Sequence, residues 1–266
     1  AIAIKGNKII AVCGKDEKED YIGAKTEVFD YQDELIMPGF HDFHTHVFLG
    51  SLSIDTVDLH EAKSEDDASE MVGEFSKSRP DDNWILGYGW YHVFWEDKKL
   101  PTKKSLDKHI PDRPVFLFNA EYHGAWVNSK ALELCNINRN TNDPPFGKIE
   151  RDDKGEPTGY LYETAVPLVA QKALSFTNDY RDKILNDFME KASRYGVTSV
   201  NNMLSLPGAE LDDPEIYKNK ESDKELTVRI FIEGALTESL ERAEYLRENF
   251  NTEKVKFTGL KEFLDG

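Results

Sequence analysis

The chain has 266 residues, of which 39% are hydrophobic and 31% charged, enough apolar material for one large domain or two smaller ones. Its 33 basic and 50 acidic residues give a formal charge of −17, and a surface that negative repels phosphate backbones and anionic lipids. No apolar run approaches the ~20 residues that a membrane-spanning helix needs. We therefore expect neither nucleic acid nor a membrane as a partner.

The two cysteines, Cys13 and Cys135, are far apart in a chain large enough to fold without a crosslink. A disulfide is not needed, so a reducing compartment is the default. The sequence therefore predicts a cytoplasmic protein.

The N-terminal stretch predicts a small β element. AIAI and KIIAVC are typical of two paired strands, and the Gly6-Asn7 dipeptide between them tolerates the positive φ of a tight turn. The following residues up to Gln32 are polar and rich in turn formers. We therefore expect residues 1–34 to form a segment ahead of a main domain at 35–266.

From Leu35 onward, apolar strand-like runs alternate with segments of helical periodicity. The six runs are LIMPGF, WILGYGW, PVFLFN, GVTSVNNM, LTVRIFIEG and VKFTGLKEFL. This alternation is typical of βα units around a buried parallel sheet and favours a (β/α) barrel over a sandwich. Six strands are two short of the eight that close such a barrel.

Three helices are predicted from their apolar stripes and their ends. Ser64 caps the first, and the second stops at Gly196, where a left-handed residue is favoured. Thr237 caps the third. The stripes consist of Ala68, Met71, Val72 and Phe75; of Leu185, Phe188, Met189 and Ala192; and of Leu240, Ala243 and Tyr245 or Leu246.

Residues 38–46, PGFHDFHTH, carry the most informative motif. Because side chains alternate along a strand, Asp42, His44 and His46 are expected on one face. Two imidazoles at this spacing can hold one metal ion at the C-terminal end of a barrel strand, and Asp42 can accept a hydrogen bond from one of them. We predict His44 and His46 as metal ligands, with buried, hydrogen-bonded core histidines as the alternative.

PGFHDFHTH resembles the first-strand signature of the amidohydrolase superfamily, PGF-x-D-x-H-x-H. Other stretches resemble one subgroup, that of N-substituted formamide deformylase and the exoenzyme-regulator-like amidohydrolases. They are VDLHEAKSEDD, WILGYGW, residues 100–132, GKIERDDKGEPTGYLYETA, GVTSV and GLKEFLDG, in order along almost the whole chain. The resemblance implies a metal-dependent hydrolase of C–N bonds in a small-molecule amide or formamide substrate.

The same resemblance implies a fold and a cofactor. The fold is α/β, a (β/α)8 TIM-like barrel that is incomplete in this chain, with AIAIKGNKIIAVCG as part of a small N-terminal β-sandwich. The cofactor is Zn²⁺ or another divalent metal, as one or two ions. Members of the superfamily are roughly twice as long and carry further histidines and an aspartate on later strands, whereas the last histidine here is His123. We therefore expect an N-terminal half that is inactive alone and can form a homodimer.

Two residues can complete the metal site by resemblance. Lys261 in GLKEFLDG matches a family lysine that resembles the one carboxylated in binuclear members; alternatively it pairs with Asp265 or Glu262. Glu163 in GYLYETA is the other candidate, because a carboxylate needs no modification to bind metal. Alternatively, Glu163 begins a helix.

A histidine and an aromatic cluster are assigned to the substrate. His123 matches a family histidine that donates to the substrate carbonyl oxygen, with a structural histidine beside Trp126 as the alternative. The aromatic cluster predicts an apolar pocket for an aryl or acyl substituent, or else a surface patch. It comprises Trp84, Tyr88, Trp90, Tyr91, Phe94 and Trp95.

Two other classes of function remain open on the sequence. A regulatory or binding protein can keep the amidohydrolase fold without catalysis, and metal content would separate it from an enzyme. A scaffold half that acts only after pairing is the other possibility, and hydrodynamic size would reveal it.

Overall fold

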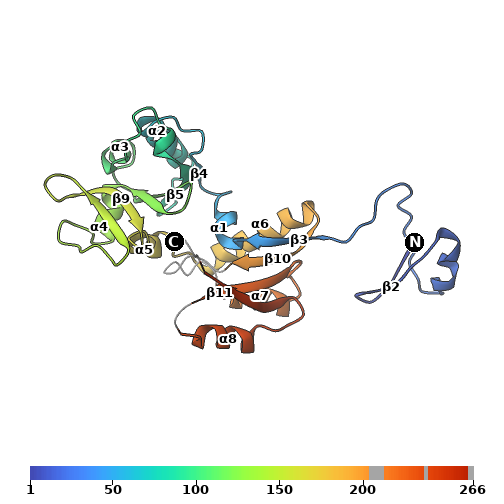
Figure 1. Cartoon of the computed structure of the whole chain (residues 1–266). Coiled ribbons are helices and arrows are strands. Elements are labelled where there is room, and N and C mark those ends of the chain that lie inside the picture. Colours follow the sequence, from blue (N-terminus) through green and yellow to red (C-terminus); the bar gives the residue numbers. More distant parts are fainter. Residues whose placement is uncertain (204–212, 237–238, 263–266) are drawn as a thin grey trace. The chain divides into compact units, whose positions relative to one another are not determined.

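The computed structural model describes residues 1–203, 213–236 and 239–262 and divides the chain into two units, Ala1–Pro38 and Gly39–Gly266 (Figure 1). In the first unit, β1 (Ile2–Lys5) and β2 (Lys8–Val12) pair antiparallel, and Gly6 between them has a φ of +63°. The predicted hairpin is therefore confirmed. A short 3-10 helix, η1 (Lys15–Tyr21), follows. The larger sandwich predicted around these strands stays a prediction.

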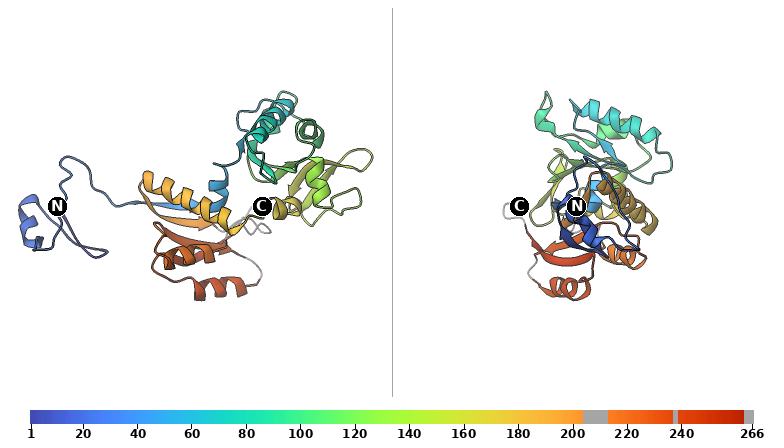
Figure 2. Two further views of the ribbon diagram at one scale, coloured as in Figure 1. Left: turned by 180° about the vertical axis from the view of Figure 1, so that it is seen from behind. Right: turned by 90° about the vertical axis from the view of Figure 1, so that its right-hand side faces the viewer.

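The second unit contains a four-stranded parallel sheet in the order β12-β11-β10-β3 (Figure 1). Its strands are β3 (Phe40–Thr45), β10 (Val197–Met203), β11 (Arg229–Ala235) and β12 (Val255–Lys261). Its helices are α6 (Asn178–Arg194), α7 (Glu215–Ser222) and α8 (Glu241–Asn249), which lie along the sheet in Figure 2. This strand–helix alternation is the arrangement that the sequence predicted for a barrel wall.

One face of this sheet is covered by helices. Val200, Ile230 and Ile232 are buried in one core with Leu185 of α6 and Leu246 of α8. Because side chains alternate along a strand, residues 201, 231 and 233 lie on the opposite face. That opposite face carries the polar groups described below.

The same unit contains a six-stranded mixed sheet in the order β4-β5-β6-β7-β9-β8. Its strands are β4 (Val57–Asp58), β5 (Ile85–Trp90), β6 (Val115–Asn119), β7 (Gly124–Val127), β8 (Gly147–Arg151) and β9 (Pro157–Glu163). β4, β5 and β6 run parallel, and the remaining pairings are antiparallel. Helices in this part are α1 (Val47–Leu52), α2 (Glu65–Lys77), α3 (Lys103–His109), α4 (Ser129–Leu134), α5 (Pro167–Ala173) and the short η2 (His92–Phe94).

The α/β class is correct, but the assignment of six strands to one barrel is wrong. WILGYGW and PVFLFN form β5 and β6 of the mixed sheet, and only four of the predicted strands share the parallel sheet. The first of those four begins at Phe40, five residues later than Leu35. An apolar run predicts a strand but not its partner, and β6 turns back within a few residues to pair with β7. A closed eight-stranded barrel stays a prediction.

The helix ends follow local rules. The Ser64 side chain accepts a hydrogen bond from the Asp67 backbone N–H at 3.1 Å, and Gly196 after α6 has a φ of +69°. Thr237 lies outside the described residues, and Leu246 is the buried residue of α8. Among the helices that the structure describes, none is long and apolar enough to cross a membrane.

Tryptophans form the core of the six-stranded sheet. Trp90 is 0% exposed and Trp95 is 1% exposed, and both contact Trp126 at ring-centroid distances of 5.8 Å and 6.3 Å. Each indole N–H donates to a backbone carbonyl, as Trp90 does to Leu117 at 3.2 Å and Trp95 to Ala62 at 3.1 Å. Trp90 and Trp95 are therefore core residues, and their prediction as pocket walls is wrong.

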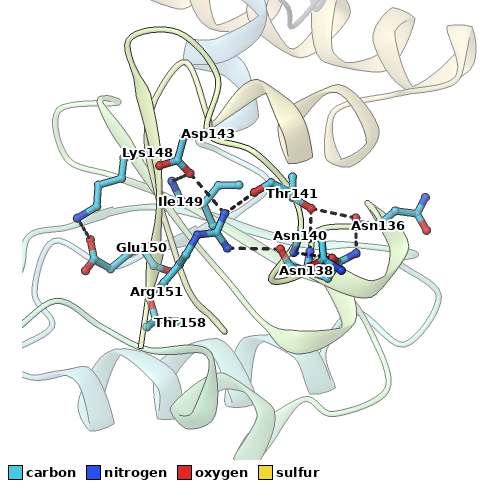
Figure 3. Close-up of polar contacts among 10 residues, drawn as sticks. All are labelled: Asn136, Asn138, Asn140, Thr141, Asp143, Lys148, Ile149, Glu150, Arg151 and Thr158. Atoms are coloured by element: carbon cyan, nitrogen blue, oxygen red, sulfur yellow. Dashed lines mark hydrogen bonds and ion pairs between the residues drawn. The ribbon is translucent and has the colours of Figure 1, made fainter. Parts of the chain in front are cut away.

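Polar contacts fasten the loop between α4 and β8 (Figure 3). Arg151 of β8 donates to the Asn138 carbonyl at 3.4 Å and to the Asp143 carboxylate at 3.4 Å. Asp143 also accepts the Ile149 backbone N–H at 3.1 Å. The loop therefore gains a fixed path beside the β8–β9 hairpin, which ends at the candidate site residue Glu163.

Candidate active site

His44 and His46 lie at the C-terminal end of β3, which is continued directly by α1. The β3–β10 register is irregular here: Asp42 pairs with Val200 and Thr45 pairs with Asn202. Thr45 and Asn202 therefore share the helix-covered side, and His44, its neighbour in the strand, lies on the opposite side, while His46 follows the strand as the residue before α1. Their rings are 5.6 Å apart between centroids.

Asp42 does not share the face of the two histidines, because the irregular register places it opposite the buried Val200. The register thus separates Asp42 from the predicted common face, and the common face of His44 and His46 stays a prediction. Asp42 Oδ1 accepts the backbone N–H of His44 at 3.0 Å. That contact fixes the local backbone, and a bond from Asp42 to an imidazole ring stays a prediction.

The environment of His46 favours the neutral ring. Burial lowers the pKa of His46, the charges of His44 and Lys261 lower it further, and a backbone contact at Met203 opposes them. Its Nδ1 is buried and has no hydrogen-bond partner among the described residues. A neutral imidazole with an unused nitrogen is the form that binds a divalent metal.

Lys261 is brought to the same region by the sheet register. It ends β12 and pairs with Ala235 of β11, and its charge is one of the causes that lower the pKa of His46. Asp265, one of the partners considered for it, lies outside the described residues. The structure thus brings His44 and His46 together, and the charge of Lys261 acts on His46; a shared metal site of the three stays a prediction.

These residues fit part of a metal site. Two imidazoles suit Zn²⁺ and similar ions, and a carboxylated lysine would add an anionic oxygen. Within the described part of the chain, no three His, Cys, Asp or Glu side chains gather closely enough to hold a metal ion. The unused Nδ1 of His46 is the observation that favours a ligand role.

A polar chain crosses the strands on the same face. His41 Nε2 lies 2.7 Å from Asn201 Oδ1, and Asn201 Nδ2 donates to Glu233 Oε1 at 2.6 Å. The His41 ring also stacks on Phe43 and Phe231, with centroids at 4.3 Å and 5.2 Å. These contacts connect β3, β10 and β11 beside the two histidines. Sequence spacing did not reveal them, because the partners come from separate strands.

A buried asparagine holds the backbone immediately after His46. Asn202 is 0% exposed, and its Oδ1 accepts the Val47 backbone N–H at 2.9 Å. Its Nδ2 donates to the hydroxyl of the buried Tyr217 at 3.1 Å. An amide in an apolar core is costly unless both its groups are bonded, and here both are. Asn202 therefore fixes the first turn of α1 at the point where the chain leaves His46.

His123 and Glu163 contact each other in the six-stranded sheet. The Glu163 carboxylate oxygens lie 3.2 Å and 3.1 Å from His123 Nδ1, and the Glu163 backbone N–H donates to the His123 carbonyl at 2.9 Å. Glu163 has a φ of +46° and Tyr122, before His123, has +64°. Left-handed backbone at residues other than glycine is sparsely populated and persists where surrounding contacts enforce it.

This pairing decides between the interpretations of Glu163. The residue ends β9, so the interpretation as a helix start is wrong. Its carboxylate contacts an imidazole and belongs to no described group placed to hold a metal. A role for Glu163 as a metal ligand stays a prediction that the contacts do not favour.

Sequence analysis missed a second carboxylate–imidazole pair. His60 Nδ1 lies 2.7 Å from Asp58 Oδ1, which also accepts the His60 backbone N–H at 3.0 Å. The Tyr88 hydroxyl donates to Asp58 Oδ2 at 3.3 Å, and the Tyr88 ring meets the imidazole edge-on at 5.4 Å. The D-x-H spacing was the available signal, since this turn lets a carboxylate reach the ring two residues on.

A small apolar pocket lies between α1 and the six-stranded sheet. Tyr88 and Tyr122 line it together with Leu49 and Ser53. Of the aromatic cluster predicted to form a pocket, Tyr88 lines this one, and its role in holding a substrate stays a prediction. Trp84 is half-buried and packs against the main core.

Two histidines at the C-terminal end of a strand in a parallel α/β sheet suit a divalent metal, at the edge where such sheets place their active sites. The sequence profile of the Amidohydrolase family matches residues 27–266, so the chain belongs to this family. It is 30% identical over 250 residues to the putative amidohydrolase YtcJ of Bacillus subtilis (strain 168), covering 94% of this chain and 47% of that protein.

A second relative is named after its substrate. The chain is 29% identical over 221 residues to N-substituted formamide deformylase of Arthrobacter pascens, covering 79% of this chain and 40% of that protein. Among solved structures, an uncharacterised metal-dependent hydrolase from Pyrococcus horikoshii OT3 matches with a TM-score of 0.62 and 25% identity, over 86% of this chain and 43% of that one. The chain therefore spans about half the length of the proteins it matches.

Proposed function

We propose that the whole protein hydrolyses C–N bonds of small amide or N-substituted formamide substrates with a divalent metal, Zn²⁺ or a similar ion. The observation that carries the proposal is the close pair of His44 and His46 after β3: their ring centroids are 5.6 Å apart, and His46 Nδ1 is buried without a hydrogen-bond partner among the described residues. Family membership and the relative named for N-substituted formamides support the reaction class.

Each residue of this chain has a task in the proposed reaction. His44 and His46 hold the metal through neutral imidazoles, and a carboxylated Lys261 supplies an oxygen ligand. The chemistry that the bound metal contributes is polarisation of the scissile carbonyl and activation of a water molecule. His123 donates to the substrate carbonyl oxygen from Nε2 in its doubly protonated form, in which Nδ1 donates to Glu163.

The experiment measures metal content and turnover in the whole protein. Metal is determined by mass spectrometry in the wild type, in His44→Ala/His46→Ala, and in His109→Ala, a control at the exposed end of α3. We expect metal in the wild type and the control and its loss in the double variant. An unchanged metal content in the double variant would show that the metal assignment is wrong.

The same preparations distinguish catalysis from regulation. A panel of N-formyl and N-acyl amines is screened with the wild type, and we expect release of amine from at least one class. A metal-replete protein that hydrolyses no member of the panel would favour the alternative, a regulatory or binding protein on the amidohydrolase fold.

A further inference from the structure

The pairing of β3 with β10 contains one extra residue of β3 at the candidate metal site. Two residues, Phe43 and His44, lie opposite the single residue Asn201. Such a two-against-one arrangement is a β-bulge, which re-aims the side chains of its strand. Regular alternation from Asp42, which pairs with the buried Val200, would put His44 on the helix-covered side of the sheet. The bulge puts His44 on the opposite face instead.

Two polar side chains hold the backbone of this bulge. The extra residue of a bulge loses its place in the hydrogen-bond ladder, and here the His44 backbone N–H donates to Asp42 Oδ1 at 3.0 Å. Further along the chain, the Val47 backbone N–H donates to Asn202 Oδ1 at 2.9 Å. The backbone is therefore anchored at His44 and again at the residue after His46.

Asn201 contacts β3 from the face to which His44 points. Its Oδ1 lies 2.7 Å from His41 Nε2, and its Nδ2 donates to Glu233 Oε1 at 2.6 Å. Because an ionised carboxylate can only accept hydrogen bonds, Glu233 sets the orientation of the Asn201 amide. The amide oxygen therefore faces His41, and the imidazole donates to it from Nε2.

Both ends of this hydrogen-bonded chain are fixed by packing. Glu233 Oε2 lies over Gly259, where an added Cβ would come within 3.1 Å of it. The His41 ring stacks on the ring of Phe43 with centroids 4.3 Å apart. The chain from Glu233 to His41 thus ends on a residue of the bulge itself, next to His44.

We propose that Asn201, held by Glu233, is a positioning residue for metal binding, because it maintains the β-bulge that directs His44 away from the core. The proposal rests on the metal site proposed above and adds to it the element that forms the site. A one-residue shift in pairing reverses the face to which every side chain of a strand points. Without the Asn201 amide, His41 loses its partner, the bulge relaxes, and the metal loses the His44 imidazole.

The test counts the imidazoles on the metal and needs no turnover. The whole protein is loaded with one equivalent of Cu²⁺, an ion that imidazole binds well, and pulsed EPR counts the bound rings through their remote nitrogens. We expect two imidazoles in the wild type and one in both His44→Ala and Asn201→Leu. Ser199→Ala is the control, because Ser199 pairs with His41 on the same strand as Asn201, and it should keep two.

The affinity for Zn²⁺ gives a second measurement on variants that circular dichroism shows to be folded. It should fall roughly 10- to 100-fold in Asn201→Leu, and by less in Glu233→Gln, whose amide oxygen can still accept. His41→Phe keeps the stacked ring and removes only the donor, so it disturbs the fold least and should also lose one imidazole.

The outcomes separate this inference from the proposed function. Two bound imidazoles in folded Asn201→Leu or His41→Phe would overturn the inference and leave the proposed metal site intact. Fewer than two in the wild type would overturn both, since His44 and His46 would then not share a metal.

Discussion

The histidines near the two sheets of the second unit differ in the hydrogen-bond partners of their ring nitrogens. At the end of β3, His46 has a buried Nδ1 without a hydrogen-bond partner in the described part of the chain, and a lysine charge lies nearby. In the six-stranded sheet, His60 and His123 each place Nδ1 on a carboxylate. An imidazole with an unused nitrogen suits metal binding, whereas a carboxylate-held imidazole suits oriented hydrogen bonding. We therefore propose that the parallel sheet is the metal side and the mixed sheet the substrate side.

The largest expected effect tests which aromatic residues of the mixed sheet are structural. Trp90→Ala should lower the free energy of unfolding by ~3–5 kcal/mol, because it empties a fully buried site and removes an indole hydrogen bond. The measurement is denaturant unfolding. Phe94→Ala is the matched control, since Phe94 is 81% exposed, and it should change stability by less than ~0.5 kcal/mol. Equal stability losses would contradict the assignment of Trp90 to the core.

Local patterns predicted elements better than their pairing. The Ser64 cap, the Gly196 stop and the Gly6 turn depend on residues within one or two turns, and all three occur as predicted. The assignment of WILGYGW to the barrel failed because strand partners are set by long-range packing. β7 and β9, which pair with each other inside the mixed sheet, were not predicted at all.

The candidate site shows the same limit. The proximity of His44 and His46 followed from their spacing, and Lys261 followed from resemblance. The pairs Asp58–His60 and His123–Glu163 depend on turns, on a left-handed φ at Glu163 and on the register between β7 and β9. Sequence periodicity carries no information about such contacts. Asp42 does not lie on the predicted face, because one irregularity in the β3–β10 pairing shifts the alternation of side chains along β3.

The next prediction tests whether the metal side uses Lys261 or Glu163. Lys261→Ala should lower metal content and reduce activity by about 100-fold, with partial recovery when short carboxylic acids occupy the vacated ligand position. Glu163→Ala should leave metal content unchanged, because Glu163 binds His123. Metal content and turnover of the whole protein are measured with and without added acid. Loss of metal in Glu163→Ala, with no rescue of Lys261→Ala, would move the ligand role to Glu163.

A smaller effect is expected for Asn202, which holds the backbone directly after His46. Asn202→Leu should cost ~2 kcal/mol of stability, since it leaves the buried Val47 N–H without its acceptor and removes the hydrogen bond between Asn202 and Tyr217. Metal affinity, measured where each variant is fully folded, should fall in Asn202→Leu more than in Leu226→Ala, a buried control. Equal affinities would reduce Asn202 to a purely structural role.

The smallest expected effect concerns Asp55, which links a helix of the mixed sheet to a helix of the parallel sheet. Asp55, between α1 and β4, accepts hydrogen bonds from Arg79 after α2 and from Tyr180 of α6, at 2.6 Å and 2.9 Å. Burial raises the pKa of Asp55, but these bonds and the positive charges of Arg79 and Lys183 outweigh it, so the pKa lies below its usual value. The carboxylate therefore connects helices of both sheets, and most strongly while it is ionised.

The sign of the pH dependence follows from this lowered pKa. A carboxyl whose pKa is lower in the folded state stabilises the fold above its unfolded pKa of about 3.9, and the contribution disappears as the pH falls through the folded value. Asp55→Asn should therefore cost ~1 kcal/mol at pH 7 and progressively less below pH 4. Urea unfolding at pH 7 and at a pH below 4 measures the stability lost by Asp55→Asn at each pH. Glu190→Gln is the control, because its ion pair with Arg194 is exposed. A cost that stays constant between the two pH values would mean that the uncharged hydrogen bonds, and not the ionised carboxylate, form this link.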